Sequence, residues 1–284
     1  MIKVISPGFY SSIQDLGRYG YGGFGVPVSG AMDQFTAKLA NQLLGNTTKA
    51  AVLEITLGNC KLLFEKQLDI CISGADFLPK INGENAMLNK VLTIQKDDIL
   101  TFDRPVFGAR CYLAINGGFQ TEMVLKSRSY YKSITNVERL QKNDILPILE
   151  NLPPKTRSLS IIKVNAEHFS TNIIKVCKGP EYNFLDLEQQ KSLLNTTFTI
   201  SKENNRMGYR LNELIVNDLS AIITSAVLPG TVQLTPSGEL IVLMRDCQVT
   251  GGYPRILQLT ENAINILAQK STGDRFNFRI EPLN

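Results

Sequence analysis

The chain has 284 residues, of which 43% are hydrophobic and 20% are charged, so it can bury a full core and is not a disordered chain. This length fits two domains or one large β-rich domain. Its 30 basic and 26 acidic residues leave a net charge of only +4, and no run of basic residues concentrates it. We therefore expect neither a nucleic-acid partner nor a membrane surface.

The cysteines and the single histidine limit the kinds of site that the chain can hold. The five cysteines are scattered without a C-x-x-C pair, so we expect no disulfide framework, no zinc site and a reducing, cytoplasmic compartment. His168 is the only histidine, which argues against a Ser-His-Asp triad. Cys111 and Cys247 are interpreted as small core residues rather than nucleophiles. No export signal and no membrane span are expected, because no stretch reaches 18 apolar residues.

Short apolar segments broken by Gly, Asn, Asp or Pro predict a mainly β fold with a few helices. The first helix is predicted over residues 32–44, where apolar residues recur at intervals of four before a Gly-Asn stop. A second helix is predicted to open at Pro180, because proline favours the first helical position. A third is predicted over residues 262–269, with Thr260 as its cap.

A small internal repeat suggests duplicated β-barrels. Residues 95–102 (QKDDILTF) resemble residues 141–148 (QKNDILPI), and residues 269–278 are a looser third copy. Each copy predicts a polar turn in which an aspartate leads into a strand. The simplest interpretation is a recurrent entry into a β-hairpin of a barrel.

The segment 150–159 is the best candidate for a linker between two domains. Its Pro153-Pro154 pair favours an extended chain that cannot continue the interior of a sheet. A boundary at this point predicts an N-terminal domain over residues 1–152 and a C-terminal domain over residues 153–284. Each of these has an ordinary domain size.

The glycine-rich segment at residues 19–25 (YGYGGFG) leads from Arg18 toward the first helix. Bare backbone N–H groups near a helix start suit an anion such as phosphate or carboxylate, but the residues alone favour a flexible loop. The spacing matches neither nucleotide-binding glycine fingerprint. Arg18 either binds a carboxylate or braces the loop through a salt bridge. Asp33 is either a functional carboxylate or the N-cap of the helix.

Two further charged positions are candidates for a functional role. In NRMGYRL (residues 205–211), Arg206 lies beside a glycine turn and is a candidate anion ligand, whereas Arg210 is expected to face solvent from a strand. Glu54, in LEITLG, is either a buried carboxylate or part of the polar face of a strand.

The segment MRDCQVTGGYPRI combines an amide, a hydroxyl and a phenol with bare glycine N–H groups after a strand end. Gln248, Thr250 and Tyr253 therefore form a candidate pocket for a polar small molecule. An ordinary glycine hairpin is the competing interpretation. Reasoning from the residues alone ends at a two-domain β protein with polar, glycine-rich pockets and names no substrate.

The order of several motifs resembles one family over nearly the whole chain. The motifs are QDLGRYGYGGFGVPVSGAMD, LANQLLGN, LEITLG, ISGAD, GARCYLAINGG, SRS, KGPE, NRMGYRL and TGGYP with LAQKSTGD. The sequence resembles the allophanate hydrolase subunit 2 or Kip antagonist family, also called biotin-dependent carboxyltransferase-like. The resemblance implies a fold of two cyclophilin-like β-barrel domains. The chain departs from the usual family pattern at Lys126 and Tyr130, where Gly and Thr are more common.

The resemblance implies a subunit of a bacterial ATP-dependent 5-oxoprolinase, which opens 5-oxoproline to L-glutamate. The implied partners are an allophanate hydrolase subunit 1 or Kip inhibitor-like subunit and a LamB/YcsF-like subunit. ATP with Mg²⁺ is the implied co-substrate, and because the chain has no Walker motif we expect a site shared with a partner. No metal-ligand set is predicted within the chain itself.

Under the 5-oxoprolinase hypothesis, the chemistry of the reaction suggests roles for the candidate residues. Arg18, Arg128 and Arg206 are cast as anion ligands for carboxylate or phosphate, and Asp33 and Glu54 as orienting or proton-handling carboxylates. Gln248, Thr250 and Tyr253 are cast as polar groups of the substrate pocket.

Two other functions stay open at this point. In the first, the chain transfers a carboxyl group from biotin to a urea-like amide, and since it has no carrier-lysine motif another protein would supply the biotin. In the second, it is a regulatory binding protein that antagonises a Kip inhibitor-like partner and turns over no substrate.

Overall fold

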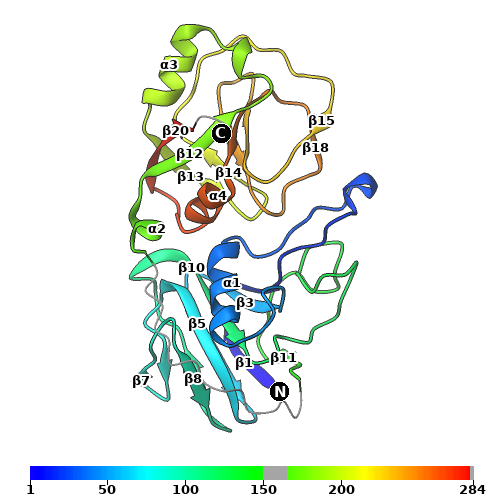
Figure 1. Ribbon diagram of the computed structural model, residues 1–284, viewed down its shortest axis with the longest axis vertical. Coiled ribbons are helices and arrows are strands. Elements are labelled where there is room, and N and C mark those ends of the chain that lie inside the picture. The colour runs from blue at the N-terminus through cyan, green and yellow to red at the C-terminus, as the bar shows by residue number, and fades with distance from the viewer. Residues whose placement is uncertain (150–164, 282–284) are drawn as a thin grey trace. The chain divides into compact units, whose positions relative to one another are not determined.

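The computed structural model describes residues 1–149 and 165–281, so the predicted linker boundary lies outside the described residues. Among these residues the chain divides into two compact units (Figure 1). The first comprises residues 1–18, 29–149 and 165–166, and the second comprises residues 19–28 and 167–281. The glycine-rich segment thus groups with the second unit, although its place in the sequence assigns it to the N-terminal domain.

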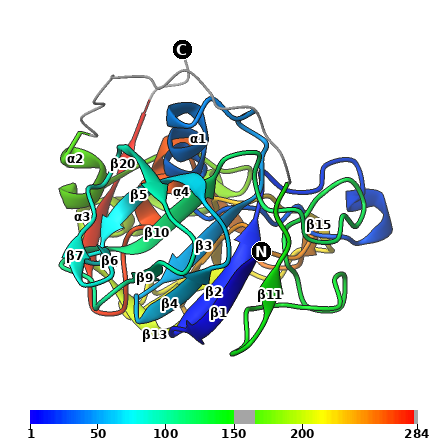
Figure 2. The ribbon, with the colours of Figure 1, turned by 90° about the horizontal axis from the view of Figure 1, so that it is seen from below.

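Two antiparallel sheets make up the first unit (Figure 2). One has the strand order β11-β1-β4-β9-β6-β7 and the other the order β2-β3-β10-β5-β8. The strands are β1 (Ile2–Pro7), β2 (Tyr10–Gln14), β3 (Val52–Thr56), β4 (Cys60–Phe64), β5 (Leu68–Asp76), β6 (Lys80–Ile81), β7 (Glu84–Asn85), β8 (Val91–Ile94), β9 (Ile99–Thr101), β10 (Phe107–Ile115) and β11 (Ile145–Leu146).

Strand alternation gives the five-stranded sheet two buried faces. On β3, Leu53 and Ile55 point into a core shared with the other sheet, together with Leu113 of β10. Val52 and Tyr112 point to the opposite face, where helix α1 (Gln34–Leu43) packs. A polar residue on that second face is therefore enclosed between sheet and helix.

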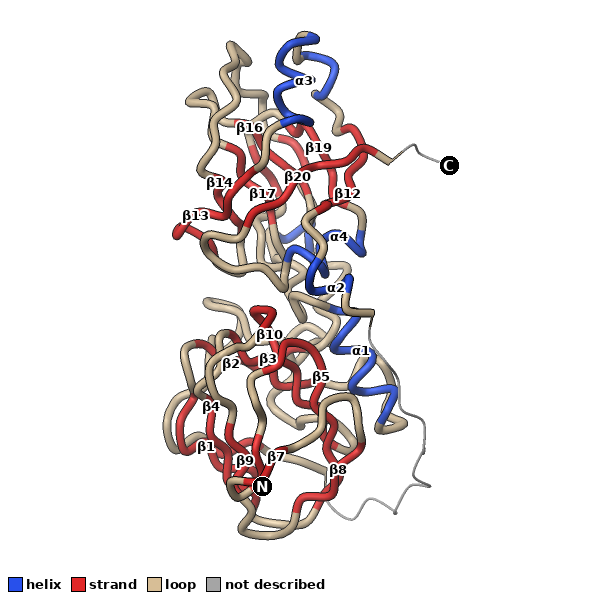
Figure 3. Tube along the Cα trace, turned by 90° about the vertical axis from the view of Figure 1, so that its left-hand side faces the viewer, coloured by secondary structure: helices blue, strands red, loops and turns tan. Residues whose placement is uncertain are grey.

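A closed barrel forms the second unit, with the strand order β12-β19-β16-β17-β14-β13-β20 (Figure 3). Closure is completed by one parallel pair, β12 with β20, among antiparallel neighbours. The strands are β12 (Ile173–Lys178), β13 (Phe198–Asn204), β14 (Gly208–Leu211), β16 (Thr231–Leu234), β17 (Leu240–Leu243), β19 (Arg255–Leu259) and β20 (Arg275–Ile280), with β15 (Ser225–Ala226) and β18 (Thr250–Gly251) as a separate pair.

Two of the three predicted helices are confirmed, each with its expected stop or cap. Helix α1 is followed by Gly45 with a positive φ of 66°. Helix α4 (Glu261–Leu267) begins after Thr260, whose hydroxyl accepts a hydrogen bond from Ala263 N–H over 3.2 Å. The structure also contains α2 (Glu167–Ser170), which the sequence analysis does not predict.

The helix predicted to open at Pro180 begins later than expected. A single 3₁₀ turn, η2 (Tyr182–Phe184), follows the proline and ends in an extended residue. The helix itself is α3 (Leu187–Asn195). Asp186 accepts from Gln189 N–H at 2.8 Å and the Gln189 side chain accepts from Asp186 N–H at 2.9 Å, so this reciprocal capping box sets the start.

The internal repeat is confirmed as one recurring turn. In each copy an aspartate carboxylate accepts a hydrogen bond from the backbone N–H three residues earlier, over 2.7, 2.8 and 2.7 Å for Asp98, Asp144 and Asp274. The residue before each aspartate has a positive φ, of 68°, 74° and 89°. Strands β9, β11 and β20 begin directly after these aspartates, so the same turn chemistry serves both units.

The expected mainly β class is confirmed. The closed barrel belongs to the second unit, while the described strands of the first unit form two sheets that share a core. Within residues 1–149 and 165–281, none of the helices has the length and apolar character that a bilayer crossing demands.

Candidate functional site

Asp33 and Glu54 meet in one buried network at the start of α1. Glu54 Oε2 accepts hydrogen bonds from Met32 N–H at 2.8 Å and from the Tyr112 hydroxyl at 2.9 Å. The Tyr112 oxygen in turn accepts from Asp33 N–H at 2.8 Å. Arg110 Nε lies 3.8 Å from Glu54 Oε1, so the carboxylate has a cation beside it. The side chains of Asp33, Glu54 and Tyr112 are all fully buried.

These contacts hold the first turn of the helix against the sheet. The Asp33 carboxylate accepts from Thr36 N–H at 3.1 Å and from the Thr36 hydroxyl at 2.6 Å, which makes it the N-cap of α1. Burial, followed by the charge of Glu54, raises the pKa of Tyr112 well above its ordinary value, so it serves as a neutral donor. The N-cap interpretation of Asp33 is confirmed, and a catalytic role for Asp33 or Glu54 stays a prediction.

Asp15, which the sequence analysis passes over, organises the SRS loop. Its carboxylate accepts from the hydroxyls of Ser127 and Ser129, each over 2.7 Å, and from Arg128 N–H at 2.7 Å. It also accepts from Gly17 N–H at 2.8 Å. The motifs QDLGR and SRS, more than 100 residues apart in sequence, therefore form one structural unit.

Arg18 and Arg128 belong to this same assembly. Arg18 is 1% exposed, and its guanidinium donates to the Ser129 carbonyl. The Arg128 guanidinium donates to the Thr121 carbonyl and to Gln120 Oε1, the latter over 2.9 Å. Both arginines thus stabilise the loop by donating hydrogen bonds to backbone carbonyl or side-chain amide oxygens. Their assignment as anion ligands stays a prediction.

Arg206 forms a buried bidentate ion pair in the second unit. Its Nε lies 2.8 Å from Asp246 Oδ2, and its second nitrogen donates to Oδ1 over 3.0 Å. Asp246 N–H also donates to the Arg206 carbonyl at 2.9 Å. The guanidinium is therefore directed at a carboxylate of the same chain. Arg210, expected to face solvent, is 41% exposed and pairs with Glu203 and Glu239.

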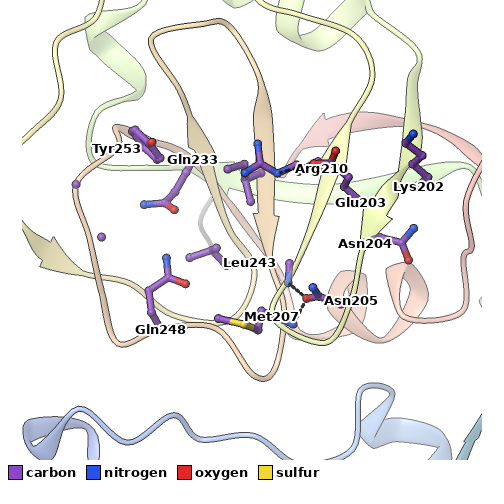
Figure 4. A pocket seen from close by; sticks show the side chains of 14 residues that line it. Lys202, Glu203, Asn204, Asn205, Met207, Arg210, Gln233, Leu243, Gln248 and Tyr253 are labelled. Atoms are coloured by element: carbon purple, nitrogen blue, oxygen red, sulfur yellow. Dashed lines mark hydrogen bonds and ion pairs between the residues drawn. The ribbon is translucent and has the colours of Figure 1, made fainter. Parts of the chain in front are cut away.

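A polar pocket of about 570 Å³ opens on the barrel of the second unit (Figure 4). Gln248 and Tyr253 line it, as the sequence predicts, together with Arg210, Asn205 and Gln233. Its volume lies within the ordinary range for small-molecule sites. Thr250 lies in β18 and is exposed, and it is not among the residues that line this pocket.

The predicted site residues thus fall into separate groups. Asp33 and Glu54 share one buried network in the first unit, and Arg18 and Arg128 share another around Asp15. In the second unit, Gln248 and Tyr253 share the pocket. The sequence analysis singles out none of Tyr112, Gln233 and Asp246. Tyr112 lies within the largely apolar strand β10, and Gln233 lies within the four-residue strand β16.

Four of the five cysteines are buried thiols rather than activated nucleophiles. All five are free, and Cys60, Cys71 and Cys247 are buried. Burial raises the pKa of each of these three thiols from 9.0 to about 12. Burial also raises the pKa of Cys111 well above 9.0, so the expected assignment of Cys111 and Cys247 to the core agrees with their burial.

A family model described as "Carboxyltransferase domain, subdomain A and B" matches residues 24–280 of the chain. The chain belongs to this family. The resemblance drawn from the ordered motifs is thereby confirmed, and the match spans both units of this carboxyltransferase-domain protein.

Two kinds of relative are similar to this carboxyltransferase-domain chain. A 5-oxoprolinase subunit of Escherichia coli is 34% identical over 284 residues, which cover 98% of the chain and 90% of that protein. The corresponding 5-oxoprolinase subunit of Haemophilus influenzae is 28% identical with the same coverage. Urea amidolyase of Lachancea kluyveri is 40% identical over 130 residues, but these cover 45% of the chain and 7% of that enzyme.

Solved structures with the same fold are longer chains. The crystal structure of TTHA0988 matches 98% of the chain with a TM-score of 0.88 at 25% identity, and the chain spans 55% of it. The urea amidolyase structure from K. lactis matches 98% of the chain with a TM-score of 0.86 at 27% identity. The chain corresponds to 18% of that enzyme.

Proposed function

We propose that the chain is a subunit of an ATP-dependent 5-oxoprolinase, which converts 5-oxoproline to L-glutamate with hydrolysis of ATP. The observation that carries this proposal is the 34% identity to the E. coli 5-oxoprolinase subunit across 98% of the chain and 90% of that protein. The match with the urea amidolyase of L. kluyveri has a higher identity but covers only 45% of the chain. A relationship along the whole length supports the oxoprolinase function better than one along a part.

The pocket of the second unit supports a small polar substrate. Its lining includes the amides of Gln233 and Gln248, the phenol of Tyr253 and the guanidinium of Arg210. 5-Oxoproline offers a lactam carbonyl, a lactam N–H and a carboxylate, and each of these has a complementary group in that set. We assign substrate binding to this pocket rather than to the buried carboxylates of the first unit.

Activation of the lactam requires groups beyond this pocket. Transfer of the γ-phosphoryl group of ATP to the lactam oxygen releases ADP and makes the ring carbon electrophilic. Water can then add to that carbon and the ring C–N bond can break, which leaves an acyl phosphate that a second water hydrolyses to L-glutamate and inorganic phosphate. Because the Arg206 guanidinium donates to the Asp246 carboxylate, we do not assign phosphate binding to it. We therefore propose that ATP and Mg²⁺ bind at a site shared with a partner, in a cytoplasmic complex.

The proposed partners are an allophanate hydrolase subunit 1 or Kip inhibitor-like chain and a LamB/YcsF-like chain. The test is glutamate production from 5-oxoproline by this chain alone, by each pair and by all three proteins, with and without ATP. We expect ATP-dependent turnover only from the complete mixture. A verified complex of all three chains that makes no glutamate would overturn the proposal.

Carboxyl transfer from biotin to a urea-like amide is the second candidate. It is favoured by the similarity to urea amidolyases in sequence and in fold. The same purified complex is supplied with a biotinylated carrier, ATP and labelled bicarbonate, and label appearing in an acid-labile urea product identifies this function. If the chain instead binds a Kip inhibitor-like partner tightly and neither reaction proceeds, its role is that of a regulatory antagonist.

A further inference from the structure

Gln233 is the one polar side chain of the pocket that is both deeply buried and unpartnered among the described residues. It is 2% exposed, and its Nε2 has no hydrogen-bond partner. It lies on β16, where the pairing with β19 shifts register between Val232 and Gln233. Such a shift re-aims a side chain. Here the re-aimed amide lines the pocket instead of joining a hydrogen-bonded pair within the barrel.

The residues around this amide leave space for it at the wall of the pocket. A Cβ on Gly251 would lie 2.5 Å from Gln233 Nε2, so glycine at that position makes room for the amide. In Figure 4 the amide of Gln248 faces the same space from below, and Tyr253 lies above. A buried N–H group without an acceptor is unfavourable, and a ligand oxygen in this space would relieve that cost.

We propose that Gln233 Nε2 donates a hydrogen bond to the amide carbonyl oxygen of the substrate and selects for it. The ligand class is a small planar amide, either a lactam or a urea. The naming of 5-oxoproline as the member of that class rests on the proposed function. Gln233 is thus a specificity-determining residue of the pocket.

The donor is tested by replacing Gln233 with two side chains of similar size. Gln233→Met keeps the volume and removes the amide, and Gln233→Glu puts a carboxylate in place of the donor. Binding to the full-length chain is measured by ligand-observed NMR titration with four probes: 5-oxoproline, 2-pyrrolidone, urea and L-proline. L-proline retains the carboxylate of 5-oxoproline but lacks the amide oxygen.

We expect 5-oxoproline and 2-pyrrolidone to bind the native chain, and Gln233→Met to weaken both by at least tenfold. Gln233→Glu should weaken them further because its carboxylate repels the ligand oxygen. Gly251→Ala should also weaken binding, since its Cβ displaces the amide. Gln190→Glu is the matched control, because Gln190 lies on α3, donates to the Leu185 carbonyl and is not among the residues that line the pocket.

A readout of stability separates ligand recognition from a structural role. Because Nε2 makes no hydrogen bond in the described chain, Gln233→Met should leave Tm unchanged or higher while affinity falls. A lower Tm of Gln233→Met with unchanged affinity for the amide probes would overturn the inference. Failure of all three amide probes to bind the native chain would also overturn it. If urea binds with the same dependence on Gln233 and 5-oxoproline does not, the inference survives and the oxoprolinase proposal fails.

Discussion

Glu54 and Tyr112 lie directly opposite each other on β3 and β10, and the tyrosine hydroxyl donates to Glu54 Oε2 over 2.9 Å. Both side chains occupy the face of the sheet that α1 covers. The same hydroxyl oxygen accepts from Asp33 N–H at the start of that helix. One cross-strand pair therefore sets where the helix begins and how it is held to the sheet.

Removal of the Tyr112 hydroxyl should cost substantial stability. Tyr112→Phe takes a donor from the buried Glu54 carboxylate and an acceptor from Asp33 N–H, so we expect a loss of about 2–3 kcal/mol in the free energy of unfolding. Urea unfolding measures the change. The control is Tyr10→Phe, whose hydroxyl donates to the Glu138 carbonyl at an exposed site and should cost less than about 1 kcal/mol. Equal losses in the two variants would contradict the network.

The buried thiols make the protein sensitive to alkaline pH. Cys60, Cys71 and Cys247 have a folded pKa of about 12 against 9.0 in water. A raised pKa contributes stability that is fully present below pH 9 and is lost as pH rises toward 12, because the unfolded chain ionises first. Each thiol then lowers the free energy of unfolding by about 1.4 kcal/mol per pH unit in that window.

Urea unfolding between pH 7.5 and 11 tests this dependence. Cys71→Ala should make the alkaline decline shallower by about 1.4 kcal/mol per pH unit, although it lowers stability at neutral pH by removing a packed side chain. Cys177→Ala is the control, because Cys177 is only half-buried. If Cys71→Ala declines as steeply as the native chain, burial does not raise the pKa of the Cys71 thiol in the folded state.

Local features of this fold were predictable because their causes lie within a few residues. The helix stop at Gly45, the Thr260 cap and the repeated aspartate turns each depend on contacts no more than four residues apart. The start of α3 was misplaced because the Asp186–Gln189 capping box was not weighed against Pro180. Contacts between residues close in sequence were thus sufficient to predict the helix ends and turns.

The site was less predictable because its contacts join distant residues. Tyr112 and Glu54 are 58 positions apart, and Asp15 and Ser127 are 112 apart. Strand register and loop packing bring these groups together, and neither can be predicted from the neighbouring residues in the sequence. Gln233 was invisible for a related reason, since its orientation follows from a register shift between β16 and β19.

We expect the main role of the Arg206–Asp246 ion pair to be stabilisation of the folded chain. Arg206→Ala leaves the buried Asp246 carboxylate without its bidentate partner, and we expect a loss of about 3–5 kcal/mol in the free energy of unfolding. Arg210→Ala is the control, because its pairs with Glu203 and Glu239 are partly exposed and contribute about 0–1 kcal/mol. The double variant Arg206→Met, Asp246→Leu should be more stable than Arg206→Ala, since it removes both charges together.

Guanidinium chloride is unsuitable for this series because it screens charge, so urea unfolding is the measurement. If Arg206→Ala unfolds like the native chain while the assembled complex loses activity, Arg206 is an anion ligand after all. A parallel loss of stability and activity, recovered together in the double variant, identifies a structural pair.

Lys126 occupies a backbone conformation that favours glycine. It follows Leu125 in a two-residue turn in which Val124 and Ser127 exchange backbone hydrogen bonds of 2.8 and 3.1 Å. Both central residues have a positive φ, 51° for Leu125 and 62° for Lys126. Turns of this kind prefer Asn-Gly, and a side chain in the left-handed region costs about 1–2 kcal/mol.

Lys126→Gly should therefore raise the free energy of unfolding by about 0.5–1 kcal/mol, the strain relieved less the greater entropy of glycine in the unfolded chain. Lys49→Gly is the matched control: this exposed lysine lies outside the left-handed region, so the same substitution should lower stability by about 0.5–1 kcal/mol. Urea unfolding of both variants decides the sign. Because the turn leads directly into Ser127 and Arg128, which Asp15 holds, a loss of stability in Lys126→Gly would mean that the lysine side chain itself supports the loop.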